Sequence, residues 1–143
     1  MRFEFEVERT YRHDPAKVWR ALTDPAALGA WLMETDFAAE VGRAFWMRCD
    51  DGRGGTDLYL CKVLALEPQR RMVWSWRRDA EEGAGETQVE FRLEEVAGGT
   101  RLTVRHSGDL EPAWIERFKG GWPLKLDLLD GVLGAAGEQK TPS

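Results

Sequence analysis

The sequence predicts an α+β protein in which a curved antiparallel β-sheet wraps around a long C-terminal helix. Three observations predict it. An alternating strand begins the chain, two short helix-start signals follow it, and a run of strand-like segments then leads to an apolar helical segment. Short connections between the strand-like segments favour antiparallel neighbours. Because a helix laid across a curved sheet tends to enclose an apolar hollow, this order indicates a binding site for small hydrophobic molecules.

The N-terminal elements have clear local signals. Phe3, Phe5 and Val7 alternate with glutamates, which is typical of a strand with one face in water. Asp14-Pro15 and Asp24-Pro25 each predict a helix start. Aspartate caps the first backbone N–H groups of a helix, and proline fits its first turn. We therefore expect two short helices directly after the first strand.

The remaining strands are delimited by turn residues. Glycine, proline and acidic residues interrupt the apolar segments at regular intervals. The expected strands are Arg43–Cys49, Asp57–Leu66, Arg71–Arg78, Thr87–Glu95 and Arg101–Ser107. The register of Asp57–Leu66 stays open, because both of its faces carry apolar residues.

The turns predict a register for the last three strands. If Gly98-Gly99 is the tip of the last hairpin, Phe91 lies opposite His106. If the preceding loop also closes symmetrically, Trp74 lies opposite Phe91. We therefore predict the row Trp74–Phe91–His106 across the concave side of the sheet.

The C-terminal segment is expected to be helical from Pro112, with an interruption or bend at 120–123. Its apolar residues recur at helical spacing and predict a buried face. They are Trp122, Leu126, Leu129 and Leu133. We expect a single domain over residues 1–136 and a flexible polar tail over 137–143.

Composition and charge exclude several classes of protein. Of the 143 residues, 43% are hydrophobic and 31% charged, as in globular rather than disordered proteins. The net charge of -5 argues against nucleic-acid binding, which needs a basic face. No apolar segment approaches the ~20 residues of a membrane-spanning helix, so membrane insertion is not expected. The first residues do not resemble a signal peptide, and a cytoplasmic location is expected.

The cysteines and the acidic hairpin tip suggest no metal or redox site. Pairing through the turn after Cys49 places Cys61 near Ala44, on the order of 16 Å from Cys49 along the strands. A disulfide needs Cα atoms within ~7 Å, so two free thiols are expected. Asp50, Asp51 and Asp57 are expected to be solvated. Neither a metal nor a cofactor is predicted.

Catalytic patterns are sparse. The chain has two histidines, and its three serines lie outside any nucleophile elbow. His106 is the titratable residue that the pattern places among apolar neighbours. It could hydrogen-bond a ligand or act as a general base, or it could be a core histidine satisfied by a carbonyl, a hydroxyl or water. No catalytic residue is assigned.

The candidate ligand-binding residues are those that the predicted geometry turns toward the hollow. Their selection depends on the architecture, since core packing explains each ring equally well. They are Trp74, Trp76, Phe91, His106, Trp122, Leu126 and Leu129.

Several segments resemble one family. The segment from Asp14 to Pro25, with Leu28 and Trp31 after it, resembles the opening signature of proteins homologous to the ATPase activator of the ninety-kilodalton heat-shock chaperone. Further matches are Glu67-Pro68, Val73–Trp76, Gly99–Gly108 and Gly121–Pro123. The resemblance implies the START-like, helix-grip fold of the SRPBCC superfamily. Its relatives include lipid and sterol carriers, polyketide cyclases, steroid-binding plant allergens and antibiotic-sequestering proteins.

Three functions are consistent with these observations. The first is non-enzymatic binding or sequestration of a small hydrophobic molecule, aromatic or polycyclic, in an internal cavity. The second is a cyclase or hydrolase that uses the same cavity. The third is a chaperone-linked protein-interaction module that acts through a basic cluster at Arg70, Arg71, Arg77 and Arg78. Whether the protein is an enzyme stays open at this point, and the first function is preferred.

Overall fold

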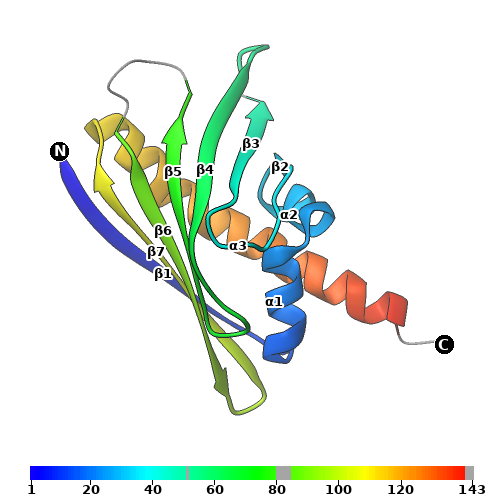
Figure 1. The fold of residues 1–143 in the computed structure, drawn as a ribbon. Coiled ribbons are helices and arrows are strands. Elements are labelled where there is room, and N and C mark those ends of the chain that lie inside the picture. The colour runs from blue at the N-terminus through cyan, green and yellow to red at the C-terminus, as the bar shows by residue number, and fades with distance from the viewer. Residues whose placement is uncertain (51, 80–84, 141–143) are drawn as a thin grey trace.

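A computed structural model describes residues 1–50, 52–79 and 85–140 of the chain (Figure 1). Its elements in chain order are β1 (Arg2–Tyr11), α1 (Pro15–Thr23), α2 (Pro25–Trp31), β2 (Glu34–Thr35), β3 (Ala44–Asp50), β4 (Thr56–Glu67), β5 (Arg71–Arg78), β6 (Thr87–Val96), β7 (Gly99–Asp109) and α3 (Pro112–Lys140). The strands form one seven-stranded antiparallel sheet in the order β1-β7-β6-β5-β4-β3-β2. The predicted α+β architecture is confirmed.

The two short helices begin where the capping signals predict. The Asp14 carboxylate accepts a hydrogen bond of 2.8 Å from the backbone N–H of Lys17. The Asp24 carboxylate accepts one of 3.0 Å from the N–H of Ala27. Each aspartate therefore satisfies a donor that the first helical turn leaves free.

The concave face of the sheet and one side of α3 form the core. Figure 1 shows α3 crossing the sheet from the end of β7 toward α2. Buried residues alternate along β6 and β7, whereas β5 is buried on both faces from Met72 to Trp76; the inward residues of the three strands share the predicted common face. They are Met72, Trp74, Trp76, Val89, Phe91, Leu93, Leu102, Val104 and His106. The helix adds Trp122, Leu126, Leu129 and Leu133 to the same cluster.

The predicted row Trp74–Phe91–His106 is wrong by two residues. Val89 lies opposite both Trp74 and His106, and Phe91 lies opposite Val104 and Met72. The last hairpin turns one position earlier than predicted, with Gly98 at φ 82° and Val96 paired to Gly99. Because side chains alternate with a period of two, the error leaves every residue on its predicted face.

The structure settles the register of β4 that the sequence left open. Phe45 lies opposite Cys61, one position from the predicted Ala44. On the other side Val63 pairs with Trp74, and the register then shifts before Ala65. The alternation reverses beyond this bulge, which leaves Leu64 exposed. Both cysteines are free thiols, as expected.

Helix α3 and strand β2 depart from the sequence-based expectations. The helix is continuous through 120–123, so of the predicted interruption or bend the interruption is wrong. Pro123 removes one backbone donor, but the buried Trp122 and Leu126 on either side hold the turn against the sheet. The helix also continues to Lys140, into the segment expected to be a tail, and 141–143 lie outside the described residues. Strand β2, of two residues, is too short to show a period.

Among residues 1–50, 52–79 and 85–140, no helix has both the length and the apolar character that crossing a membrane requires.

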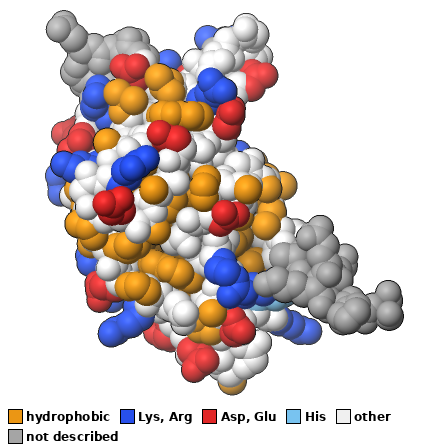
Figure 2. Space-filling view, turned by 45° about the vertical axis from the view of Figure 1, so that its right-hand side comes forward, with side chains coloured by type: hydrophobic (Ala, Val, Ile, Leu, Met, Phe, Trp, Pro, Cys, Tyr) orange, Lys and Arg blue, Asp and Glu red, His pale blue; other side chains and the backbone are white. Residues whose placement is uncertain are grey.

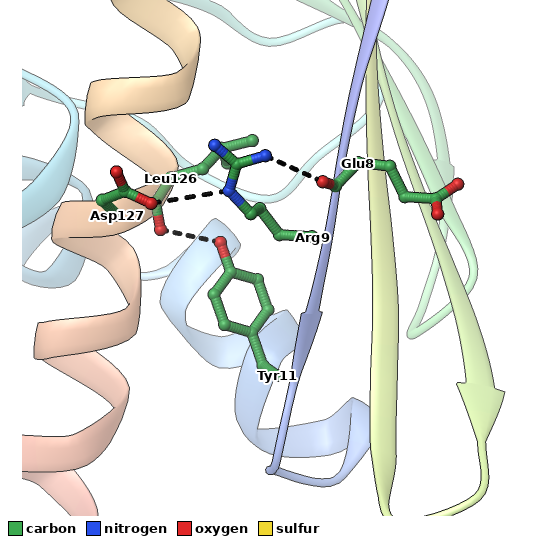
Figure 3. A network of polar contacts seen from close by, with 5 residues as sticks. All are labelled: Glu8, Arg9, Tyr11, Leu126 and Asp127. Carbon is green, nitrogen blue, oxygen red and sulfur yellow. Dashed lines mark hydrogen bonds and ion pairs between the residues drawn. The ribbon is translucent and has the colours of Figure 1, made fainter.

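Contacts between β1 and α3 fix the position of the helix (Figure 3). The Tyr11 hydroxyl donates a buried hydrogen bond of 2.8 Å to the carbonyl of Leu126. The Arg9 guanidinium reaches Asp127 one residue further along, at 3.5 Å. Successive residues of α3 are thus joined to the edge strand, and Leu126 is held facing the sheet.

Candidate functional site

His106 lies at the centre of the concave face and has no exposed surface. Its Nε2 atom is 2.9 Å from the Thr87 hydroxyl on β6, and its Nδ1 atom is 3.1 Å from the Trp122 indole nitrogen on α3. The Thr87 hydroxyl also donates to the carbonyl of Trp76 on β5, at 3.0 Å. One histidine therefore connects two strands of the sheet to the helix that crosses them.

The hydrogen bonds on either side of His106 determine its tautomer. An indole N–H can only donate, so Nδ1 of His106 accepts from Trp122. The proton of the Thr87 hydroxyl goes to the carbonyl of Trp76, so that hydroxyl accepts from His106. The histidine is consequently neutral and carries its proton on Nε2.

Burial lowers the pKa of His106 from its ordinary value to about 3. The imidazolium form would lose its hydration among aromatic rings. At neutral pH the ring is uncharged, and both of its nitrogens are occupied by protein groups. This is the bonding of a satisfied core histidine, and it leaves no free lone pair for general-base chemistry.

Aromatic side chains surround this chain of hydrogen bonds. The Trp74 and Trp76 rings lie nearly parallel, with centroids 6.5 Å apart and an interplanar angle of 27°. Trp74 contacts Phe91 at 4.7 Å, and Trp76 contacts Trp122 at 5.9 Å. These rings therefore contact one another both face to face and edge to face at short distances.

Two donors in this aromatic interior have no acceptor. The indole Nε1 atoms of Trp74 and Trp76 are buried, and neither finds a hydrogen-bond partner among the described residues. The side chains themselves are 0% and 2% exposed. A buried donor without a partner costs about 1–3 kcal/mol, so paired orphans on adjacent inward positions of one strand are unusual.

The predicted site residues come together in one cluster. All seven are buried, and all belong to the hydrophobic core or contact it directly. They come from β5, β6, β7 and α3, as predicted. Whether they bind a ligand is untested by this arrangement, because the same packing would also build a core.

The sequence-based prediction missed Thr87, whose hydroxyl orients His106. A threonine at the start of a predicted strand is common, so nothing in the local sequence indicated a buried hydrogen bond to His106. The prediction that Asp57 is solvated is wrong: it is 5% exposed and its carboxylate is 2.6 Å from Arg117 on α3. The partner lies sixty residues away in the sequence, too far for any local pattern to indicate it. Asp50 accepts from the N–H of Gly52 in the turn, and Asp51 lies outside the described residues.

Burial keeps two further titratable groups near the cluster neutral. Burial raises the pKa of the Tyr59 hydroxyl and of the Cys61 thiol. In the part of the chain that the structure describes, no three histidine, cysteine or acidic side chains gather as a metal site would require. The described part of the interior thus presents aromatic surface and two indole donors without acceptors.

A curved antiparallel sheet closed around a long C-terminal helix, with two short helices after the first strand, defines the helix-grip or START-like class. A family model described as "Activator of Hsp90 ATPase homolog 1-like protein" matches residues 12–134. The chain belongs to this family. A comparison with curated proteins finds no match.

Solved structures of bacterial proteins share this fold. Protein MLL2253 from Mesorhizobium loti is 33% identical with a TM-score of 0.80, and the match covers 93% of this chain and 98% of that one. CalU16 from Micromonospora echinospora is 25% identical with a TM-score of 0.74, covering 96% and 80%. DynU16, described as a putative protein in the dynemicin biosynthetic locus, is 25% identical with a TM-score of 0.80. That match covers 93% of this chain and 48% of DynU16.

Proposed function

We propose that this protein binds a small, largely apolar, aromatic or polycyclic molecule between the concave face of its sheet and α3, without transforming it. The fold supports the proposal, since relatives of this class enclose apolar molecules in the same place. The location of DynU16 in a biosynthetic locus supports an association with small-molecule metabolism in the family. A cytoplasmic location remains part of the proposal.

The observation that carries the proposal is the pair of orphan indole donors. A ligand with a carbonyl, ether or hydroxyl oxygen would give Trp74 or Trp76 the acceptor that the described residues do not supply. The parallel rings would at the same time pack on a flat ligand. One ligand would therefore satisfy both the polar and the apolar parts of the site.

Each predicted residue then has a definite role. Trp74 and Trp76 donate hydrogen bonds, while Phe91, Leu126 and Leu129 form apolar walls. Trp122 packs against Trp76 and is held by His106 through its own N–H. His106 acts here by positioning Trp122 rather than by contacting a polar group of the ligand, because both of its nitrogens are occupied.

A matched pair of ligands tests the role of the donors. 2-Acetylnaphthalene carries a ketone oxygen where 2-ethylnaphthalene has none, and the two have nearly the same shape. We expect saturable quenching of tryptophan fluorescence by both, with the ketone bound about tenfold more tightly, as one recovered hydrogen bond predicts. Trp74→Phe and Trp76→Phe together should remove this preference. Trp46→Phe, on the opposite face of the sheet, is the control and should retain it.

Two results would overturn the proposal. One is the absence of saturable quenching by either compound, or by larger flavonoid- and polyketide-like compounds, with an unchanged melting temperature. The other is equal binding of the ketone and the hydrocarbon by the wild type, which would show that the indole N–H groups of Trp74 and Trp76 do not bind the ligand.

The other two functions receive less support from the geometry. An acid–base enzyme would need a free nitrogen on His106, and both are taken. The basic cluster expected for protein interaction is divided: Arg71 pairs with Glu90, and Arg78 turns to Asp57 on the other face. No observation favours either function over ligand binding.

A further inference from the structure

A second cluster, the Arg78–Arg117 pair, lies where α3 begins. The carboxylate of Asp57 is 2.6 Å from Nη2 of Arg117 and 3.6 Å from Nη2 of Arg78. Both guanidinium groups also lie over the ring of Trp114, at 4.3 Å for Arg78 and 4.5 Å for Arg117. Residues from β4, β5 and α3 thus converge on one point at the end of the sheet.

The cluster carries an excess positive charge. Among the described residues, two guanidinium groups share one carboxylate, which leaves these three side chains with a net charge of +1. Burial opposes the charge of Arg117, but its hydrogen bond to Asp57 and the electrostatic attraction of nearby groups together raise its pKa. The Nε atom of Arg78 is buried and has no acceptor among residues 1–50, 52–79 and 85–140. The start of α3 adds the positive end of a long helix.

Phe118 connects this cluster to the aromatic interior. Its ring is 5.8 Å from Trp114 on one side and 4.8 Å from His106 on the other. It also contacts Trp76 at 5.9 Å and Tyr59 at 6.3 Å. A continuous series of rings therefore extends from the arginines at the surface to the orphan donors inside. Figure 2 shows hydrophobic side chains reaching the surface among charged ones on one face of the molecule.

We propose that Arg78 and Arg117 bind the anionic group of the ligand, so that the preferred ligand is an apolar ring system carrying a carboxylate or similar acid. The inference rests on the proposed function and specifies its ligand class. An acid placed there would supply the second negative charge that the two guanidinium groups lack, and its oxygens would match their planar donors. The ring system would extend past Phe118 toward Trp76.

A second matched pair of probes tests this inference separately. N-Phenyl-1-naphthylamine and 1-anilinonaphthalene-8-sulfonate share one fluorescent skeleton, and only the second carries an acid. We expect the wild type to bind both with one-to-one stoichiometry and the sulfonate at least about tenfold more tightly at low salt. The preference should fall as salt is raised.

Substitution of Arg78 is the matching test on the protein. Asp57 keeps Arg117 as its closer partner when Arg78 is replaced, so Arg78→Gln should still fold. This variant should lose most of the sulfonate preference while binding the neutral probe unchanged, and Arg78→Lys should recover part of it. Arg70→Gln is the control. Arg70 is exposed in the turn between β4 and β5, at the other end of the sheet, and its loss should change neither probe.

The outcomes separate the two proposals. Equal binding of the two probes by the wild type, or a sulfonate preference that survives in Arg78→Gln, would overturn the inference and leave the proposed function standing. Failure of both probes to bind would count against both proposals. The wild-type comparison remains decisive even if the Arg78 variants prove unstable.

Discussion

At the scale of single residues, His106 combines complete burial with a full set of hydrogen bonds. The chain from Trp122 through His106 and Thr87 to the carbonyl of Trp76 requires a neutral ring with its proton on Nε2. A buried polar group with all its partners fixes one arrangement of its neighbours. This residue therefore acts on the site by determining how Trp122 lies.

The lowered pKa of His106 makes the protein sensitive to acid. The unfolded chain takes up the proton near pH 6.5, whereas the folded protein does so only near pH 3. The contribution of the neutral His106 to the free energy of unfolding is thus complete above pH 6.5 and is lost as the pH falls toward 3. Because one pKa unit corresponds to about 1.4 kcal/mol, we expect His106 to account for at most about 2–3 kcal/mol of lost stability at pH 4.5.

Urea unfolding at pH 7 and pH 4.5 measures this effect. His106→Gln should show a smaller loss between the two pH values than the wild type, although it starts from a lower stability. His13→Gln replaces a half-buried histidine whose pKa burial lowers by less, and it should change the pH dependence less than His106→Gln does. Identical pH dependence of the wild type and His106→Gln would show that other groups cause the acid sensitivity.

At the scale of secondary-structure elements, the features that depend on local sequence, such as helix starts and strand faces, could be predicted. Both helix starts follow from aspartate–proline pairs whose carboxylates cap the first turn. The common face of β5, β6 and β7 follows from strict alternation. The register did not follow, because one position in a turn such as that at Gly98 decides it. Long-range partners such as Asp57 and Arg117 leave no local signal at all.

The attachment of α3 to β1 depends mainly on Tyr11. Tyr11→Phe keeps the ring but removes the buried hydrogen bond to the Leu126 carbonyl. We expect it to lower the free energy of unfolding by about 1 kcal/mol. Arg9→Gln removes only a half-exposed ion pair and should cost less than about 0.5 kcal/mol. Chemical denaturation of both variants measures the difference, and a larger loss for Arg9→Gln would contradict this account.

At the scale of the whole molecule, one core serves both stability and the proposed binding site. The two thiols differ in exposure and can therefore serve as probes of this core: Cys61 is buried, and Cys49 is partly exposed. Burial raises the pKa of both thiols, and far more for Cys61. Any opening that exposes Cys61 must separate β4 from the aromatic cluster to which it belongs.

Thiol labelling under native conditions tests whether the core opens locally. In Cys49→Ser, which retains only Cys61, we expect labelling to occur at the rate set by global unfolding and to accelerate with urea accordingly. In Cys61→Ser, the remaining Cys49 should label faster. Rapid labelling of Cys61 without urea would reveal local opening of β4 and would place an entrance to the interior at that strand.

The turn at Gly98 has a consequence for how such chains can vary. A change of pairing register by two residues slides one strand of a hairpin along its neighbour but keeps each side chain on the same face of the sheet. A one-residue change of pairing register would instead turn the inward residues of one strand, such as Val104 and His106 on β7, out into solvent and its charged residues in. Homologues with the same inward-facing residues should therefore differ from this chain in hairpin register by even numbers of residues. A bulge such as the one at Leu64 would permit an odd difference, because it reverses the alternation again.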